Sequence, residues 1–575
     1  MKKTRTLLCL LLAAVLLVGL CAPSARAEEA RGGTLPMCPF DEMEYKRPSV
    51  TLLRFHVMGV DLAIKCEQGY KVVEGALDKC YEDYYRFSTQ SSIAYIRSCQ
   101  DTRDSFYAAE NAWCDEQSAT MSQLMEDMYY ICGMSPMAEE LEKRYFWEGF
   151  AEEYADDSNS IYDDDTVALL EQEAALVAEY RELVASPTIV WQGEEVDYYS
   201  FLEEASSYAD YWNALMLYYQ TYAPKVADVF IRMVKVRQAQ AEKMGYDSYE
   251  QMQFEYNYER DYTPEQAAQY LADIKTYIVP LFKQLFESGE LYAYEDGPLD
   301  TGRLEGVLEA GVRSIGGEAE ETFDFMKKYG MYDIAYSINK SNMSFQTYLD
   351  DYESPFLFMD AGGTLSDVTT FSHEFGHSLD AYVNYNANET IDLAEVYSQA
   401  LELLILDRLD GELSEAEIET LRQIKLADVL SMYVQQASFA EFERQVYAAD
   451  PDQLSADWLN DLSLRLAREY GYYDGYSEQY YAMSWIDIVH FFEVPFYVIT
   501  YPVSNDLAMQ LYAMERAQEG AGLDKYLEIL PHETAGVVDT ALAGGLQSPF
   551  APGRLRDVAA MLEEEMLASA QSNAA

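Results

Sequence analysis

The chain has 575 residues, 49% of them hydrophobic, so it is long enough for a large core or several packed subdomains. Its 100 acidic and 40 basic residues give a formal net charge of −60, which makes nucleic acids and anionic membrane surfaces poor partners. We interpret this charge as a solvated acidic surface that favours solubility. A preference for cationic peptides is a second hypothesis that rests on net charge alone.

The first 27 residues have the pattern of a secretory signal peptide. A basic region that ends at Arg5 is followed by an apolar stretch over 7–20, and Ala25-Arg26-Ala27 forms a small-x-small cleavage site. The apolar stretch is short for a membrane span, and no later segment is long and apolar enough for one. We therefore expect cleavage after Ala27 and secretion of the mature chain. Lipidation of Cys21 is the alternative.

Six cysteines follow the expected cleavage site, all in the first quarter of the chain. They are Cys38, Cys66, Cys80, Cys99, Cys114 and Cys132. An even number in an exported chain predicts at least one disulfide, and six cysteines allow 15 pairings. The alternative is that several are buried free thiols in helices.

Helical periodicity extends through most of the chain, because apolar residues recur at spacings of three and four. This pattern covers residues 55–150, 166–185, 200–245 and 263–288. At the start of the last range, Thr263 can cap the helix and Gln266 can complete a capping box. The acidic stretch 156–165 is interpreted as a solvated connection, because it lacks the glycine and terminal glutamate of a calcium loop. The chain is therefore predicted to be mainly α.

One short segment departs from the helical pattern. Residues 354–360 form a brief apolar run that ends just before Gly362-Gly363, which predicts a strand. The glycine pair breaks the chain there, and Thr364 or Ser366 can then cap a helix predicted over 367–385.

This predicted helix contains His373-Glu374-Phe375-Gly376-His377, an HExxH motif that uses two of the five histidines. Positions i and i+4 share a helix face, so His373 and His377 can bind one tetrahedral zinc ion. Glu374 can then act as general base toward a water at the ion. The residues that form an apolar stripe on the opposite side are Val368, Phe371, Phe375 and Leu379. The motif predicts hydrolysis of amide bonds, with the preceding strand placed to line a cleft and pair with an extended peptide.

A catalytic zinc ion usually has a third protein ligand, which must lie downstream of the motif. The candidates are Glu389, Asp392, Glu395 and Glu402. Residues 392–402 are predicted to form a helix on which Glu395, Ser398 and Glu402 share one face. We therefore predict Glu395 as the ligand and Glu402 as a supporting carboxylate. The alternative for both is an ordinary solvated glutamate.

Together these motifs resemble the zinc oligopeptidases of the oligoendopeptidase F and thimet oligopeptidase type. In that family HExGH is followed by a helix carrying E-x-x-S-x-x-x-E, which Glu395, Ser398 and Glu402 match. The resemblance covers roughly residues 40–550. Further similar segments are 44–48, 101–111, 237–246, 352–356, 363–368, 485–492 and 495–501.

The resemblance implies an almost wholly helical, elongated fold with a deep channel, zinc near its floor and a small β element beside the zinc helix. It also implies endopeptidase action on short peptides, because folded proteins cannot enter such a channel. His490, Tyr497 and Tyr501 are expected to donate hydrogen bonds to the developing oxyanion. Where the family often has a histidine three residues after the second ligand, this chain has Asp380.

The sequence thus predicts a secreted zinc endopeptidase with Glu374 as general base and oligopeptides as substrates. One zinc ion per chain is expected, held by His373, His377 and Glu395. A zinc amino- or carboxypeptidase and a non-catalytic acidic extracellular binding protein are the alternatives, and the oligomeric state stays open. The predicted regions are a signal peptide (1–27), an N-terminal helical region with the six cysteines (28–190), the zinc peptidase region (191–555) and a C-terminal helical tail (556–575).

Overall fold

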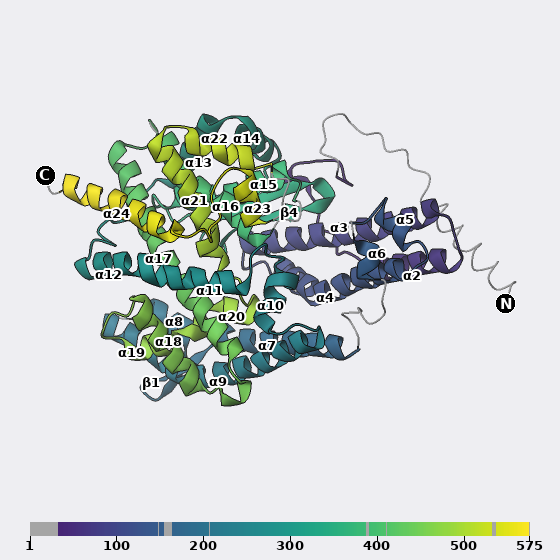
Figure 1. The fold of residues 1–575 in the computed structure, drawn as a ribbon, viewed down its shortest axis with the longest axis horizontal. Coiled ribbons are helices and arrows are strands. Elements are labelled where there is room, and N and C mark those ends of the chain that lie inside the picture. The colour runs from purple at the N-terminus through teal and green to yellow at the C-terminus, as the bar shows by residue number, and fades with distance from the viewer. Residues whose placement is uncertain are drawn as a thin grey trace.

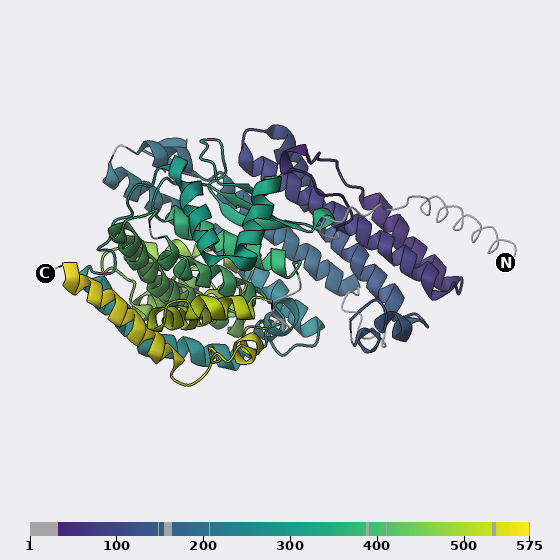
Figure 2. The ribbon, with the colours of Figure 1, turned by 90° about the horizontal axis from the view of Figure 1, so that it is seen from above.

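The computed structural model describes residues 33–573, apart from 148, 155–163, 206, 387–389, 410 and 532–535. The predicted signal peptide and most of the predicted acidic connection lie outside the described residues. The described chain is mainly helical and elongated, with N-terminal helices that extend from one end of a larger helical body (Figures 1 and 2). None of the described helices is long and apolar enough to cross a membrane.

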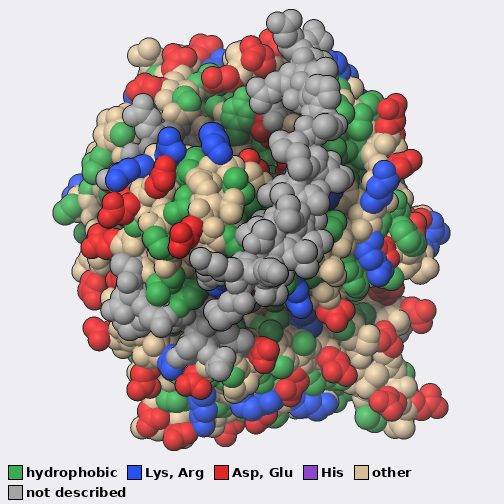
Figure 3. Space-filling model, turned by 90° about the vertical axis from the view of Figure 1, so that its right-hand side faces the viewer, with side chains coloured by type: hydrophobic (Ala, Val, Ile, Leu, Met, Phe, Trp, Pro, Cys, Tyr) green, Lys and Arg blue, Asp and Glu red, His purple; other side chains and the backbone are tan. Residues whose placement is uncertain are grey.

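The N-terminal helices form a bundle with its own hydrophobic core, which includes Leu53, Leu77, Met128 and Phe150. Its elements are α2 (Val50–Lys65), α3 (Tyr70–Gln100), α4 (Ser105–Gly133), α5 (Ala138–Glu142) and α6 (Phe150–Glu153). Helices α2, α3 and α4 pack on one another. Viewed from this end, acidic and basic side chains are interspersed with apolar ones (Figure 3).

No disulfide joins the six cysteines of the described chain to one another, so the predicted disulfide is wrong. Cys80, Cys114 and Cys132 lie in the core of the bundle, where they pack as small apolar side chains. Burial raises the pKa of Cys80 to about 12, which keeps this thiol protonated. The sequence could not separate the two possibilities, because buried thiols and bonded cysteines both occupy apolar helix faces.

A second set of elements joins the bundle to the HExxH region. It comprises α7 (Asp164–Ala185), β1 (Thr188–Trp191), β2 (Glu194–Asp197), α8 (Tyr198–Glu204), α9 (Tyr208–Lys243), α10 (Tyr249–Met252), α11 (Pro264–Asp273), α12 (Val279–Ser288), α13 (Thr301–Ile315) and α14 (Gly317–Tyr329). The capping box is confirmed, because the Thr263 hydroxyl accepts from the Gln266 N–H and the Gln266 side chain accepts from the Thr263 N–H. The helix predicted over 263–288 is interrupted by a π-helical turn between α11 and α12.

The predicted strand is present as β5 (Ser354–Met359), but it does not offer an edge to a peptide. It is the central strand of three, parallel to β3 (Tyr332–Asp333) and antiparallel to β4 (Ser344–Leu349). Every residue of β5 is buried, so peptide pairing at this strand is excluded and that prediction is wrong. The longer of the two outer strands is β4, which the sequence did not reveal because Ser344, Gln346 and Thr347 interrupt its apolar pattern.

The remaining helices enclose the HExxH segment. They are α15 (Asp367–Val383), α16 (Ile391–Leu404), α17 (Glu415–Ala448), α18 (Ala456–Tyr470), α19 (Glu478–Met483), α20 (Val489–Glu493), α21 (Thr500–Ala517), α22 (Ala521–Ile529), α23 (Val537–Ala543) and α24 (Arg554–Asn573). Helix α16 packs against both α15 and α21. It is therefore buried on all sides, including its acidic residues Asp392, Glu395 and Glu402.

The buried apolar residues form two clusters in the described chain. One is confined to the N-terminal bundle, and the other extends from Phe40 to Met566 through α7, α9 and the helices around α16. The region boundaries predicted at residues 190 and 555 stay predictions.

Candidate metal centre

The loop before α15 is held by the first residue of that helix. The carboxylate of Asp367 accepts hydrogen bonds from the backbone N–H groups of Gly362 (2.8 Å), Gly363 (2.8 Å) and Thr364 (3.2 Å). Ser366 occupies the N-cap position, but its side chain makes no capping hydrogen bond. The predicted cap from Thr364 or Ser366 is therefore absent, and the carboxylate of Asp367 binds the backbone N–H groups of the loop instead. The arrangement fixes the entry into the HExxH helix.

The apolar stripe of α15 faces the core as predicted. Phe371 and Phe375 stack on each other with ring centroids 5.5 Å apart, and both contact Phe323 of α14 edge-on. His373 and His377 are only partly buried, and their rings lie 4.9 Å apart. The packing of the phenylalanines thus directs both imidazoles to the same side of the helix.

Gly376 lets α15 and α16 touch through their backbones. A Cβ atom at this position would lie 2.6 Å from Cα of Ser398 and 2.7 Å from the carbonyl oxygen of Tyr397. No side chain larger than hydrogen fits such a contact. The glycine of HExGH therefore brings the two histidines within reach of the glutamate on α16.

His373, His377 and Glu395 each bring one potential ligand atom within 4.8 Å of the others. Oε2 of Glu395 lies 3.6 Å from Nε2 of His373 and 3.9 Å from Nε2 of His377. A tetrahedral zinc ion with bonds of about 2.0–2.1 Å separates its donors by about 3.4 Å. The three side chains therefore fit a zinc ion in both donor type and spacing.

The other candidate ligands lie elsewhere. Both carboxylate oxygens of Asp392 are engaged, one by Arg260 at 3.0 Å and one by the hydroxyl of Tyr262 at 2.9 Å. Glu402 lies behind His373, with its Oε1 at 2.9 Å from Nδ1 of that ring. This contact orients the ring so that Nε2 points toward Glu395, which is the supporting role predicted for Glu402. Glu389 lies outside the described residues.

The centre has a surplus of negative charge. Glu374, Glu395 and Glu402 are all buried, so none of them is an ordinary solvated glutamate. Lys425 pairs with Glu402. Burial raises the pKa of Glu374 to about 7, with further increases from the charges of Glu395 and Glu402. A divalent cation at this place would offset the repulsion among the carboxylates.

The two histidines titrate differently. Burial lowers the pKa of His373, but its hydrogen bond to Glu402 and the nearby carboxylates outweigh this effect and raise the pKa to about 9. Burial lowers the pKa of His377 to about 4, so this ring is neutral and has a free electron pair at neutral pH. The carboxylates of Glu395 and Glu402 thus stabilise the positive charge of a protonated His373.

His490, Tyr497 and Tyr501 form a cluster beside Glu395. The hydroxyl of Tyr497 donates to Oε1 of Glu395 at 3.1 Å. The centroid of the His490 ring lies 5.6 Å from that of the Tyr497 ring and 6.1 Å from that of the Tyr501 ring. Burial lowers the pKa of His490 and raises that of Tyr501 to about 12, so both are neutral near pH 7. The structure therefore gathers all the predicted site residues around one centre.

Arg260 connects the two segments that carry the site, and no local sequence pattern indicates this role. It donates to Asp392 on α16, to the carbonyl oxygen of Phe496 (3.0 Å) and to the hydroxyl of Thr500 (2.9 Å). Arg260 and Asp392 are separated by 132 positions and no local periodicity joins them. Arg260 thus ties the helix of Glu395 to the segment of Tyr497.

Two further buried polar side chains hold the same segment. Arg237 donates to the carbonyl oxygens of Phe491 (2.9 Å) and Phe492 (2.5 Å). Glu443 accepts from the backbone N–H of Phe496 at 2.8 Å. Phe496 has a φ of +64°, in the left-handed region that a bulky residue rarely adopts. These contacts constrain the backbone on both sides of Val494 and keep His490 and Tyr497 in place.

A cavity of about 600 Å³ opens beside the centre and is lined in part by His377, Asp380, Glu395 and Tyr497. Gln346 of β4 also lines it, and a backbone hydrogen bond from Gln346 lowers the pKa of Glu374 against the larger effect of burial. The outer edge of β4 therefore borders the cavity next to Glu374. Asp380 lines the cavity, and its Oδ1 accepts from the side chain of Asn384 at 2.7 Å.

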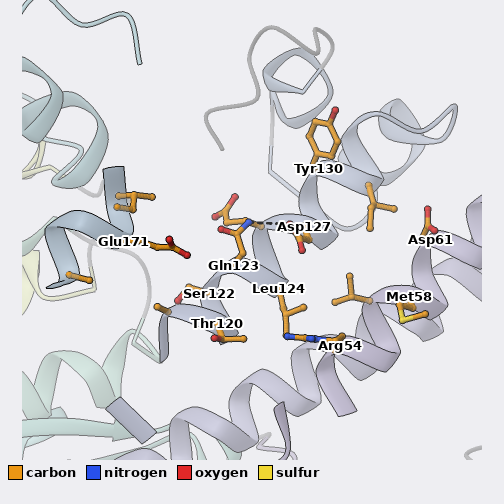
Figure 4. A pocket seen from close by; sticks show the side chains of 16 residues that line it. Arg54, Met58, Asp61, Thr120, Ser122, Gln123, Leu124, Asp127, Tyr130 and Glu171 are labelled. Carbon is orange, nitrogen blue, oxygen red and sulfur yellow. Dashed lines mark hydrogen bonds between the residues drawn. The ribbon is translucent and has the colours of Figure 1, made fainter. Parts of the chain in front are cut away.

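A larger cavity, of about 840 Å³, lies away from this centre, between the N-terminal bundle and α7 (Figure 4). Glu171 of α7 faces Gln123 and Asp127 of α4 across it, and Arg54 and Met58 of α2 lie along another side. Its described lining contains no histidine or cysteine. Cavity size alone therefore does not locate the chemistry in this molecule.

Comparisons with known proteins find relatives among peptidases. The model described as Peptidase M3 N-terminal domain matches residues 40–152, and that described as Peptidase family M3 matches residues 317–532, together more than half of the chain. The plasmid-encoded oligoendopeptidase F of Lactococcus lactis subsp. cremoris is 27% identical over 284 residues, covering 45% of this chain and 43% of that protein. Oligopeptidase PepF of Bacillus subtilis (strain 168) is 26% identical over 190 residues, covering 31% and 28%. The chain thus matches less than half the length of these curated relatives.

Solved structures share the fold. PZ peptidase A, solved with an inhibitor, superposes with a TM-score of 0.75 at 23% identity and covers 92% of this chain and 99% of its own. Oligoendopeptidase-F from Enterococcus faecium gives a TM-score of 0.61 at 18% identity, covering 91% and 97%. The predicted fold class, mainly α and elongated with a small β element, is confirmed.

Proposed function

Because the chain belongs to peptidase family M3, we propose that it is a zinc-dependent endopeptidase that hydrolyses internal bonds of short peptides. The observation that carries this proposal is the convergence of His373, His377 and Glu395, with Glu374 on the same helix as both histidines. The donor set is that of hydrolytic zinc sites, and Glu374, which follows His373 directly in the chain, is a carboxylate placed to act as the base. The relatives' names point to the same class of substrate.

Zinc held by these residues supplies a Lewis acid and lowers the pKa of water in the site. Glu374 takes a proton from the attacking water and later gives it to the leaving amine. Burial raises the pKa of this carboxyl above its usual range, which makes it a stronger proton acceptor than an ordinary exposed glutamate. His490 and Tyr501 are neutral donors that stabilise negative charge as it forms on the scissile carbonyl oxygen, and Tyr497 joins them when its hydroxyl turns away from Oε1 of Glu395.

The substrate backbone binds along the outer edge of β4. This edge borders the cavity beside Glu374, and an extended peptide can add to it as a further strand. Pairing of this kind uses hydrogen bonds to the backbone of a peptide and not to its side chains, so it suits an enzyme that accepts varied sequences. Folded proteins cannot present an extended strand at a cavity of this size.

The N-terminal pattern that ends at Ala27 supports export of the protein, with the mature chain acting outside the cell on peptides already present there. Detection of a processed form in the culture medium, with Glu28 at its N-terminus, is the expected result.

The decisive experiment is incubation with a pool of peptides of about 6–20 residues, read by mass spectrometry. Wild-type protein loaded with zinc is compared with chelator-treated protein and with Glu374→Gln. Internal cuts that vanish in both controls support the proposal, whereas retained activity in Glu374→Gln removes that residue as the base. The Glu415→Gln variant, on the exposed start of α17, is the matched control and should cleave as wild type does.

A second substrate separates endopeptidase from exopeptidase action. An internally quenched peptide with both ends blocked should be cleaved, because no free terminus is needed. Cleavage only of peptides with a free end would replace the proposal with an exopeptidase, and zinc binding without any turnover would favour a binding protein.

A further inference from the structure

A second pocket, of about 400 Å³, lies on the other side of the segment that carries His490. Ile488 and Phe491 line this pocket, whereas the ring of His490 between them faces Tyr497 and Tyr501. The pocket shares no described lining residue with the cavity at the metal centre. Its volume lies within the range of about 300–1,000 Å³ that is usual for ligand pockets.

Aromatic rings from α12, α17 and α19 and the segments around them make up most of the wall, including Tyr292, Phe439, Tyr480, Tyr481 and Trp485. Such rings carry negative charge on their faces and attract cations within about 6 Å. The wall is therefore suited either to an apolar ring or to a cation that stacks on aromatic faces.

Asp487 decides between these two ligands. It is the one described lining residue with a full charge at neutral pH, and no lysine, arginine or histidine accompanies it. Its carboxylate accepts from the hydroxyls of Tyr218 (3.1 Å) and Tyr219 (2.6 Å), which fix its position, yet the side chain stays open to solvent in the pocket. Desolvation by the surrounding protein raises the pKa of this carboxyl, against the hydrogen bonds from Tyr219 and Tyr218, which lower it.

A neutral aromatic ligand would remove water from this carboxylate and give no charge in return, which is unfavourable. A cation would pair with Asp487 and stack on the rings at the same time, so charge complementarity selects it. The net charge of −60 on the chain also favours the binding of cations, but it does not direct them to this pocket.

We propose that this pocket binds the cationic side chain of an arginine or lysine residue in a peptide, through Asp487 and the aromatic wall. The proposal rests on the proposed function only in taking a peptide as the ligand. It adds a selectivity for basic residues that the metal centre and the edge of β4 do not provide.

The test measures binding to the Glu374→Gln variant, so that no turnover is needed. A blocked peptide with one arginine is compared by calorimetry with the same peptide carrying citrulline, a neutral analogue of nearly equal shape, at about 0.15 M salt. The arginine peptide should bind about tenfold or more tightly, as expected for a charge-assisted contact. Adding Asp487→Asn should remove most of this difference.

Two further variants control the result. Asp461→Asn makes the same charge change on the exposed face of α18, outside the pocket, and should leave the preference for arginine intact. Tyr292→Leu removes a ring that is 60% exposed, keeps an apolar side chain, and should weaken arginine binding about threefold or more. This variant tests the pocket even where Asp487→Asn fails to fold.

Equal affinities for the arginine and citrulline peptides would overturn the proposal. The proposal would also fail if Asp461→Asn reduced the preference for arginine as much as Asp487→Asn does. A failure of wild-type protein to cleave any peptide would instead refute the proposed function and leave this binding result standing. The two outcomes are therefore distinguishable in one set of proteins.

Discussion

At the scale of single residues, Gly376 sets the distance between the two helices that supply the metal ligands. The atoms that a Cβ would meet belong to the backbone of Tyr397 and Ser398, so no side-chain rotation can relieve the clash. The glycine in this motif therefore has a packing reason that is independent of helix propensity.

We expect Gly376→Ala to lower the free energy of unfolding by about 1–3 kcal/mol and to weaken zinc binding, because α15 and α16 must separate. Gly306→Ala on α13 is the matched control, since a Cβ there meets nothing within 4 Å and alanine favours a helix. Urea unfolding and metal content after dialysis are the measurements. Full zinc occupancy in Gly376→Ala would show that the two helices can adjust.

Glu443 gives the stability of the protein a pH dependence. Burial raises its pKa to about 8, against the hydrogen bond from Phe496, whereas an unfolded glutamate titrates near 4.3. Between these values the folded state binds more protons than the unfolded state, so the contribution of this group to stability falls as pH rises through that window.

Glu443→Gln removes this titration, so its stability relative to wild type should increase between pH 5 and pH 8, by at most about 1.4 kcal/mol per pH unit. Denaturation by urea at both pH values measures the difference. Glu415→Gln, at the exposed start of the same helix, should show no such trend. A constant difference for Glu443→Gln across this range contradicts the assignment.

At the scale of elements, α16 is joined to the segment before α21 by the pair of Arg260 and Asp392, both of which are completely buried. Removing one partner leaves an uncompensated charge in the core, whereas removing both leaves an apolar contact of similar volume. We therefore expect the loss of one partner to destabilise the fold mainly through the unpaired buried charge that remains, and less through the lost attraction between the two side chains.

Arg260→Met should lower the free energy of unfolding by about 3–5 kcal/mol. Adding Asp392→Leu should restore a large part of that loss, because no buried charge then lacks a partner. Both are read from urea unfolding curves with unchanged slope. The contrary outcome is a double variant that is less stable than Arg260→Met. It would show that the hydroxyl groups of Tyr262 and Thr500 need the pair as their hydrogen-bond partner.

Local sequence patterns predicted the elements that carry the ligands closely. The helix predicted over 367–385 is observed as Asp367–Val383, and that over 392–402 as Ile391–Leu404. The third ligand, Glu395, could be chosen because ligand spacing and helical periodicity are both short-range properties. The edge strand β4 and Arg260 could not, because their roles depend on contacts with residues far away in the chain.

At the scale of the whole molecule, the metal centre joins α15 and α16 in the middle of the larger hydrophobic cluster. A cation there binds the folded state only, since the three ligands come together through tertiary packing. Zinc should therefore stabilise the fold, and this stabilisation should rise with the logarithm of the free zinc concentration above Kd.

Treatment with a chelator should lower the melting temperature, and added zinc should restore it, with a stabilisation of about 2.7 kcal/mol at a hundredfold excess over Kd. Thermal unfolding with and without chelator measures this shift. The Glu395→Gln variant should show a much smaller one, because a ligand is lost. A melting temperature that is indifferent to zinc in wild type would place the ion elsewhere.

The free thiols of the N-terminal bundle have a practical consequence. Because none of the six described cysteines is covalently joined to another, the fold does not depend on an oxidising compartment. The chain can therefore be produced without its first 27 residues in the reducing cytosol of an expression host, and strong reductants can be kept in every purification buffer. Once the partly exposed Cys38 and Cys66 are replaced, cysteines introduced on the surface can carry spectroscopic labels, since Cys80, Cys114 and Cys132 are shielded from reagents in water.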